Sequence, residues 1–150
     1  MLWESLPLGE RVIPLSPISH GRALLTIAAI LGCTAYFLPW LDVHAPDTWR
    51  IHGVDLGRRI LWPHAVLAAW VVIVPTAVSR RSLGGLLAAR AVLVTLALVP
   101  LVTLAVLGLR PPKHLLVRVE VTWLWGAALE ALASVLGIFA AIRLGRRGRR

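Results

Sequence analysis

Four long apolar segments constrain the fold of this chain more than any other feature of its sequence. They run from Ala23 to Trp40, from Ile60 to Val78, from Leu86 to Leu109 and from Thr122 to Ile142. At about 1.5 Å of rise per residue, each segment would form a helix of roughly 27–36 Å, and the hydrocarbon core of a bilayer is about 30 Å thick. The sequence therefore predicts four transmembrane helices.

Composition favours a membrane protein over a soluble one. Hydrophobic residues make up 58% of the chain and charged residues 15%, whereas a soluble domain has about 45–50% apolar and about 25% charged residues. The net charge of +9 is also compatible with nucleic-acid binding, but an excess of arginine at the cytoplasmic side is typical of membrane proteins. We therefore expect no nucleic-acid partner.

The basic residues predict the orientation of the spans. Arginine is more frequent on the side that carries the N-terminal segment, the loop between the second and third spans, and the C-terminal tail. By the positive-inside rule that side is cytoplasmic, and the tryptophans at the opposite span ends fit an outer interface. We expect a multi-pass protein of a bacterial inner membrane with both termini in the cytoplasm. The extramembrane parts are residues 1–22, an outer loop 41–59, an inner loop 79–85, an outer loop 110–121 and a basic tail 143–150.

The outer loops show the period-two alternation of β-strands. Leu41 to Ala45 and Trp49 to His52 alternate apolar with polar residues, and the Pro46–Asp47 pair between them is a turn signal. Residues 114–123 alternate in the same way and lead directly into the fourth span. The predicted fold is a single all-α membrane domain, a four-helix bundle with a small extracytoplasmic sheet.

This order of elements resembles the claudin-type tetraspan fold. The likeness is one of topology, because Gly53-Val-Asp stands where that family has Gly-Leu-Trp, and the loops lack its cysteine pair. Leu-Pro-Trp at 38–40 followed by Gly-Val-Asp-Leu at 53–56 is also similar to small uncharacterised four-helix membrane proteins of bacteria. Neither resemblance implies an activity, a cofactor or site residues.

One carboxylate, Glu130, lies well inside the fourth predicted span. An ionisable side chain at the centre of a transmembrane helix costs at least about 2.5–3.5 kcal/mol on insertion scales, so it normally faces protein or water. Small residues three and four positions apart share its helix face, and such a stripe allows close helix contact. We expect Glu130 to point into a helix–helix interface lined by Gly126, Ala133, Gly137 and Ala141.

Three side chains of other spans lie at the depth of Glu130 and could donate a hydrogen bond to it. They are Thr34, Trp70 and Thr103. Because no positive side chain lies at that level, the expected state of Glu130 is a neutral, hydrogen-bonded acid. The sequence leaves three roles open for it: structure or assembly, proton or substrate handling, and contact with another subunit.

Polar residues of the first outer loop could suggest a metal site. Asp42, His44, His52 and Asp55 lie in or beside the predicted hairpin, but their spacing matches no established ligand pattern. The single cysteine, Cys33, lies inside a span, so neither an intrachain disulfide nor a cysteine-based metal site is expected. The interpretation is a solvated hairpin face, with no metal and no cofactor.

The predicted function is that of a non-enzymatic structural or accessory subunit of a membrane assembly, as a homo-oligomer or in a larger complex. Motifs of phosphate-binding loops, nucleophile elbows and zinc proteases are missing from the sequence. The tail 143–150 is expected to contact anionic lipid headgroups. The alternative is a small transporter or permease subunit that uses Glu130 for proton or cation handling. A membrane enzyme with a metal site in the outer loops is a third, weaker hypothesis.

Overall fold

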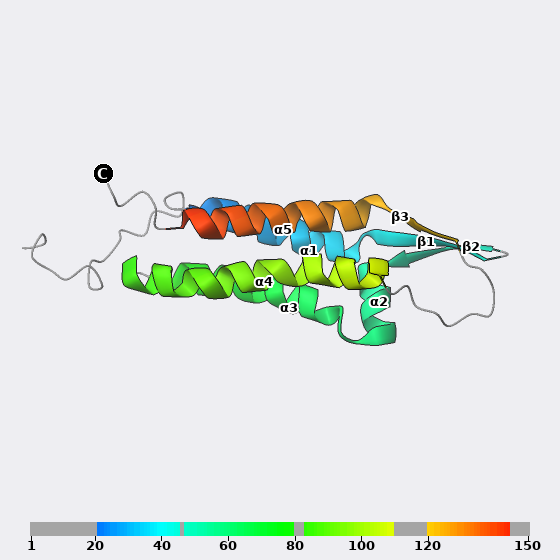
Figure 1. Ribbon diagram of the computed structural model, residues 1–150, viewed down its shortest axis with the longest axis horizontal. Helices are drawn as coiled ribbons and strands as arrows, with labels where there is room; N and C mark the ends of the chain where they lie inside the picture. The colour runs from blue at the N-terminus through cyan, green and yellow to red at the C-terminus, as the bar shows by residue number, and fades with distance from the viewer. Residues whose placement is uncertain (1–20, 46, 80–82, 110–119, 145–150) are drawn as a thin grey trace, which may run out of the picture.

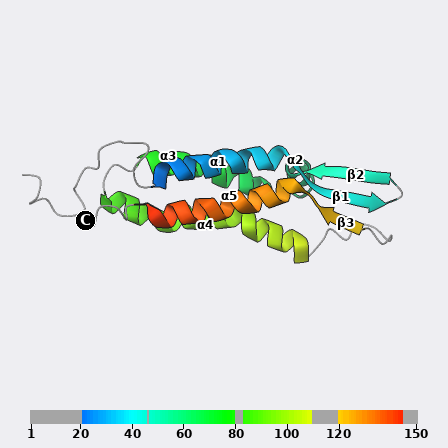
Figure 2. The same ribbon diagram turned by 90° about the horizontal axis from the view of Figure 1, so that it is seen from above.

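Four long helices lie side by side in an elongated bundle, and a small sheet extends from one end of it (Figure 1, Figure 2). The computed structural model describes residues 21–45, 47–79, 83–109 and 120–144. In chain order the elements are α1 (Arg22–Phe37), β1 (Pro39–Ala45), β2 (Asp47–His52), α2 (Gly53–Ile60), α3 (His64–Ser79), α4 (Leu83–Leu109), β3 (Glu120–Trp123) and α5 (Trp125–Arg143).

The long helices occupy the corners of a square. α1 packs against α3 and α5, and α4 packs against the same two helices. Figures 1 and 2 agree with this arrangement, since α1 lies beside α5 in one view and beside α3 in the other. α3 and α5 are therefore diagonal partners, and any contact between them must cross the interior of the bundle.

Two helical segments are long and apolar enough to cross a membrane: Ala89–Leu109 within α4, and Trp125–Arg143. The α2–α3 pair adds a third only if the two helices, bent by 115° at their break, count as one span. α1 is shorter, with 16 residues. It ends before the predicted boundary at Trp40 because Leu38 is already extended, as a residue before proline prefers to be. By length and apolarity the helices thus support two or three spans, where the sequence predicted four.

A short helix, α2, occupies the second half of the segment 41–59 that the sequence predicts as an outer loop. His52 and Asp55 form a reciprocal capping box at its start, with the His52 backbone N–H donating to Asp55 Oδ2 at 3.2 Å. Leu56 is buried and anchors the helix on the bundle. Histidine is an unusual N-cap residue, so the sequence signal for this helix is weak.

A tight turn joins α2 to α3 and accounts for the bend between them. The Trp62 N–H donates to the Ile60 carbonyl at 2.8 Å, and the residue between them, Leu61, has φ 64° and ψ −50°. This is the strained form of the γ-turn, which is rare for residues other than glycine. The second predicted span therefore begins as a helix at His64 instead of Ile60.

The sheet has three antiparallel strands in the order β2-β1-β3. The β1–β2 hairpin and the strand that leads into α5 are both as the alternation predicted, although residues 114–119 of that strand lie outside the described residues. Residues opposite one another share a face. Leu41, Ile51 and Trp123 therefore lie on one face, and Asp42, Arg50 and Thr122 on the other.

Candidate functional site

Glu130 lies in the interior of the bundle. It is on α5, where its side chain is completely buried. The small residues predicted to share its face are buried as well: Gly126, Ala133, Gly137 and Ala141. The close-packing face of α5 is therefore the inner one, and the acid lies among protein side chains and away from the outer surface of the helices.

Trp70 of α3 is the hydrogen-bond partner of Glu130. Its indole Nε1 donates to Glu130 Oε1 at 2.5 Å, and the Trp70 side chain is also completely buried. The two residues are on diagonal helices, so the indole spans the middle of the bundle. A buried indole N–H normally needs an acceptor, and Glu130 provides one.

Small residues on the other helices make room for the indole. A Cβ atom on Gly32 of α1 would collide with the pyrrole edge of Trp70, with Cδ1 at 2.7 Å. On Gly137 of α5, a Cβ atom would lie 3.2 Å from Cη2 of the indole and 3.3 Å from Cβ of Ala97 on α4. Trp70 of α3 therefore packs against α1 and α5 in the interior of the bundle.

The two threonines predicted as partners of Glu130 form hydrogen bonds within their own helices. Thr34 is exposed, and its hydroxyl donates to the Ile30 carbonyl at 2.8 Å. Thr103 is buried, and its hydroxyl donates to the Val99 carbonyl at 2.9 Å. This i to i−4 bond is the usual way for a helical threonine to satisfy its donor. Of the three candidate donors, the structure brings only Trp70 to the acid.

Two polar atoms beside this hydrogen bond have no partner among the described residues. They are Glu130 Oε2 and Ser134 Oγ, one helical turn apart on α5. Ser134 is completely buried. The sequence placed Ser134 on the same face as Glu130 without assigning it a polar role.

A second polar contact, which the sequence did not predict, lies nearer the sheet. The Tyr36 hydroxyl and His64 Nδ1 are 2.7 Å apart, and they join α1 to the start of α3. Gly57 of α2 permits this contact, because a Cβ atom there would collide with the tyrosine hydroxyl and lie 2.6 Å from His64 Cε1. The pair is 28 residues apart in sequence, so no local pattern could have indicated it.

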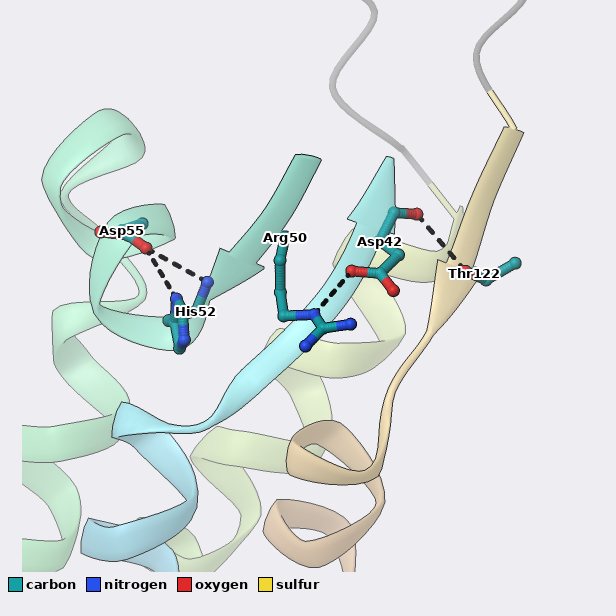
Figure 3. A network of polar contacts seen from close by, with 5 residues as sticks. All are labelled: Asp42, Arg50, His52, Asp55 and Thr122. Atoms are coloured by element: carbon teal, nitrogen blue, oxygen red, sulfur yellow. Dashed lines mark hydrogen bonds and ion pairs between the residues drawn. The ribbon is translucent and has the colours of Figure 1, made fainter. Parts of the chain in front are cut away.

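The polar residues of the first outer loop form separate pairs instead of one cluster (Figure 3). Arg50 Nε lies 3.2 Å from Asp42 Oδ1 across the hairpin, and His52 Nδ1 lies 3.2 Å from Asp55 Oδ2 at the start of α2. His44 is exposed and pairs with Thr48 in the β1–β2 register. Within the described ranges, no three His, Cys, Asp or Glu residues are grouped so that they could hold a metal ion.

Arginines mark the opposite end of the bundle. A guanidinium nitrogen of Arg90 on α4 donates to the Leu144 carbonyl, just beyond the end of α5. The guanidinium of Arg143 lies 4.1 Å from the centroid of the Phe139 ring, in a cation–π contact. The rest of the basic tail, residues 145–150, lies outside the described residues.

No protein-family model matches the chain, and comparisons with curated proteins and with solved structures found no match. The resemblance to claudin-type tetraspans and to small bacterial four-helix membrane proteins therefore stays a prediction from the sequence. What supports a function is the geometry of the buried Trp70–Glu130 pair and the chemistry of the helix surfaces.

Proposed function

We propose that this chain is an integral protein of a bacterial inner membrane, crossed by α1, α3, α4 and α5, and a non-enzymatic structural or accessory subunit of a membrane assembly. Both termini face the cytoplasm, and the sheet and α2 lie on the outer side. Its partners are further copies of the chain or a larger membrane complex, together with anionic lipid headgroups at the basic tail.

The outward-facing surfaces of all four helices support the membrane location. In a soluble bundle these surfaces would be polar, with the apolar residues turned inward. Here the inner face of α5 holds an acid and a serine, whereas the exposed faces are strongly apolar. Large exposed apolar residues are Leu24, Ile27, Ile30 and Phe37 on α1, Val71 and Val72 on α3, Val92, Leu98, Val102 and Val106 on α4, and Leu132, Val135, Phe139 and Ile142 on α5.

Exposed hydroxyl groups on these helices fit the same location. Thr34 and Thr95 are both exposed, and each donates to the carbonyl four residues earlier, at 2.8 Å and 3.0 Å. In hydrocarbon no water is present to accept those hydrogen bonds, so an internal acceptor is needed. α1 is short for a span, at roughly 24 Å for its 16 residues. Local thinning of the bilayer accommodates such a mismatch at modest cost.

The observation that best supports a structural role is the position of Trp70. The buried indole lies between the diagonal helices, where it bonds to Glu130 of α5 and packs against Gly32 of α1. A transport pathway along the bundle axis would have to displace this side chain and break its hydrogen bond to Glu130. The pair is better suited to fixing the packing of four helices than to passing a substrate between them.

The test of the assembly role is the oligomeric state in lipid. The full chain, extracted in lipid nanodiscs formed directly from the membrane, should appear in native mass spectrometry as an oligomer or with a stoichiometric partner. Particles that hold a single copy and no other protein, at every expression level tried, would contradict it.

Orientation is tested separately by thiol labelling in a Cys33→Ser background. A cysteine at Asp47, in the outer hairpin, should react with a membrane-impermeant maleimide in intact spheroplasts. A cysteine placed at Arg147, in the tail, should react only after lysis. The reverse pattern would overturn the orientation and leave the assembly role untouched.

A small transporter or permease subunit is the second candidate, because Glu130 Oε2 and Ser134 Oγ are buried with no partner in the part of the chain that the structure describes. This function predicts that Glu130→Gln abolishes flux in proteoliposomes while abundance and folding stay unchanged. The structural role predicts no flux that depends on Glu130 and only a small loss of stability in this variant, because the glutamine amide oxygen can still accept the Trp70 N–H. The two measurements on one variant therefore separate the two functions.

A further inference from the structure

Ser134 behaves differently from the threonines of the long helices. Four of these threonines, Thr26, Thr34, Thr95 and Thr103, donate their hydroxyls to the carbonyl four residues earlier. The equivalent acceptor for Ser134 would be the carbonyl of Glu130, yet the Ser134 hydroxyl has no partner among the described residues. The serine is completely buried, so bulk solvent cannot serve as its partner. Because its own helix does not accept its hydrogen bond either, the hydroxyl is available to another buried polar group.

Glu130, whose Oε2 has no partner among the described residues, is the polar residue one helical turn from Ser134 on that face. Residues four positions apart on a helix have Cβ atoms about 5–6 Å apart on the same side. One water molecule can bond to two polar atoms, each about 2.8 Å away, so a single water between these residues could serve both unpartnered atoms. A buried polar group left unsatisfied costs about 1–3 kcal/mol, so a bridging water at this point would be strongly held.

The charged groups around Glu130 determine whether its carboxyl group is neutral or ionised. From α1 the titratable or charged groups are Arg22, Cys33 and Tyr36, from α3 His64, and from α4 Arg90. Tyr36 and His64 bond to each other, and Arg90 bonds to the Leu144 carbonyl, roughly 21 Å from Glu130 along α5.

Arg22 lies at the start of α1, level with the inner end of α5, since Gly21 abuts Ala140. The described residues thus provide no positive charge at the depth of Glu130. A buried carboxylate without a positive partner is strongly disfavoured. The neutral acid is the form compatible with this interior, and its O–H group is a hydrogen-bond donor.

We propose that Glu130, as a neutral acid, and Ser134 hold one water molecule between them and form an exchangeable-proton site in the interior of the bundle. The carboxylic O–H and the Ser134 hydroxyl both donate to the water, whose oxygen accepts the two hydrogen bonds. Glu130 Oε1 keeps its bond from Trp70. The site does not depend on the assembly role, because every group that forms it belongs to one copy of the chain.

Infrared difference spectroscopy of the full chain in lipid, at neutral pH, tests this site. The wild type minus Glu130→Gln spectrum should contain the carbonyl stretch of a protonated carboxyl group. It should also contain an O–D stretch of bound water that shifts when D2-16O is replaced by D2-18O. Ser134→Ala should abolish the water band and shift the carboxyl band, as expected when its bonded partner is lost.

Thr103→Val is the matched control. Thr103 is also buried, but its hydroxyl is bonded within α4, so this variant should leave both bands in place. A carboxyl band without an 18O-sensitive water band would mean that the protonated acid holds no water, and it would overturn the proposal. A missing carboxyl band would show an ionised acid and overturn it as well. If Glu130→Gln fails to accumulate, the difference spectrum between the wild type and Ser134→Ala tests the proposal by the same two bands.

Discussion

The indole Nε1 of Trp70 lies 2.5 Å from Glu130 Oε1, and this bond joins α3 to α5 across the diagonal of the bundle. Neighbouring helices are held by extensive side-chain contact along their length. Diagonal helices have no such contact, and a large side chain must reach between them. The Trp70–Glu130 pair is therefore expected to govern the stability of the whole bundle.

Trp70→Phe should lower the free energy of unfolding by at least about 2 kcal/mol. The smaller ring leaves a cavity in the interior of the bundle and removes the donor to a buried carboxyl oxygen. The measurement is unfolding in mixed micelles of mild detergent and dodecyl sulfate. Helix content is monitored by far-ultraviolet circular dichroism, because tryptophan fluorescence would itself change in this variant.

Glu130→Gln is the matched control for that variant. The amide carbonyl of glutamine can still accept the indole N–H, so the loss should stay below about 1 kcal/mol. If the two variants lost equal stability, the hydrogen bond and the packing of the indole would not be the reason for the effect.

Gly32→Ala should be destabilising, by about 1–3 kcal/mol, because its new methyl group would overlap the Trp70 indole in a packed interior. Gly108→Ala on α4 makes the same chemical change where the nearest atom, on the Trp123 ring, is 3.7 Å away. There the higher helix propensity of alanine should raise stability by up to about 1 kcal/mol. Opposite signs for the two variants in thermal unfolding would support the packing of the indole, and equal losses would contradict it.

Leu61→Gly should stabilise the chain despite the loss of a large side chain. Leu61 is 73% exposed and has a positive φ in the turn between α2 and α3. Strain of this kind costs about 1–3 kcal/mol, while glycine adds about 0.5–1 kcal/mol of unfolded-state entropy. The expected net gain is about 1 kcal/mol in the same unfolding measurement.

Arg59→Gly tests whether that gain comes from the turn. Arg59 is exposed in the last turn of α2, where the backbone is helical. Glycine at that position should lower stability by about 1 kcal/mol. A gain at both positions would show that glycine acts for a reason other than relief of the strained φ.

Asp55→Ala should cost about 0.5–2 kcal/mol, because the side chain accepts the His52 backbone N–H and caps α2. Asp42→Asn, which weakens the ion pair with the largely exposed Arg50, should change stability by less than about 1 kcal/mol. The ranking of the two, measured at low and high salt, checks whether the cap or the ion pair contributes more to this end of the molecule.

The elements with a strong sequence period were predicted best. Alternation located the β1–β2 hairpin and the strand before α5, because a strand that is polar on one face has a period of two residues. Small residues around Glu130 identified the inner face of α5 for a related reason, since residues three and four apart share one side of a helix. The boundaries at Leu38 and His64 were less accurate, because proline and an unusual γ-turn end or redirect segments whose composition stays apolar.

The sequence by itself determined that this chain has long apolar helices, that a sheet with one polar face lies at one end of them, and that Glu130 faces the interior. Those properties follow from hydrophobicity and period, which are local. Only the tertiary structure decided that α3 is diagonal to α5, that Trp70 instead of Thr34 or Thr103 bonds to the acid, and that Ser134 has no partner on its own helix. Each of these depends on how distant helices rotate and pack, and no spacing along the chain encodes that geometry.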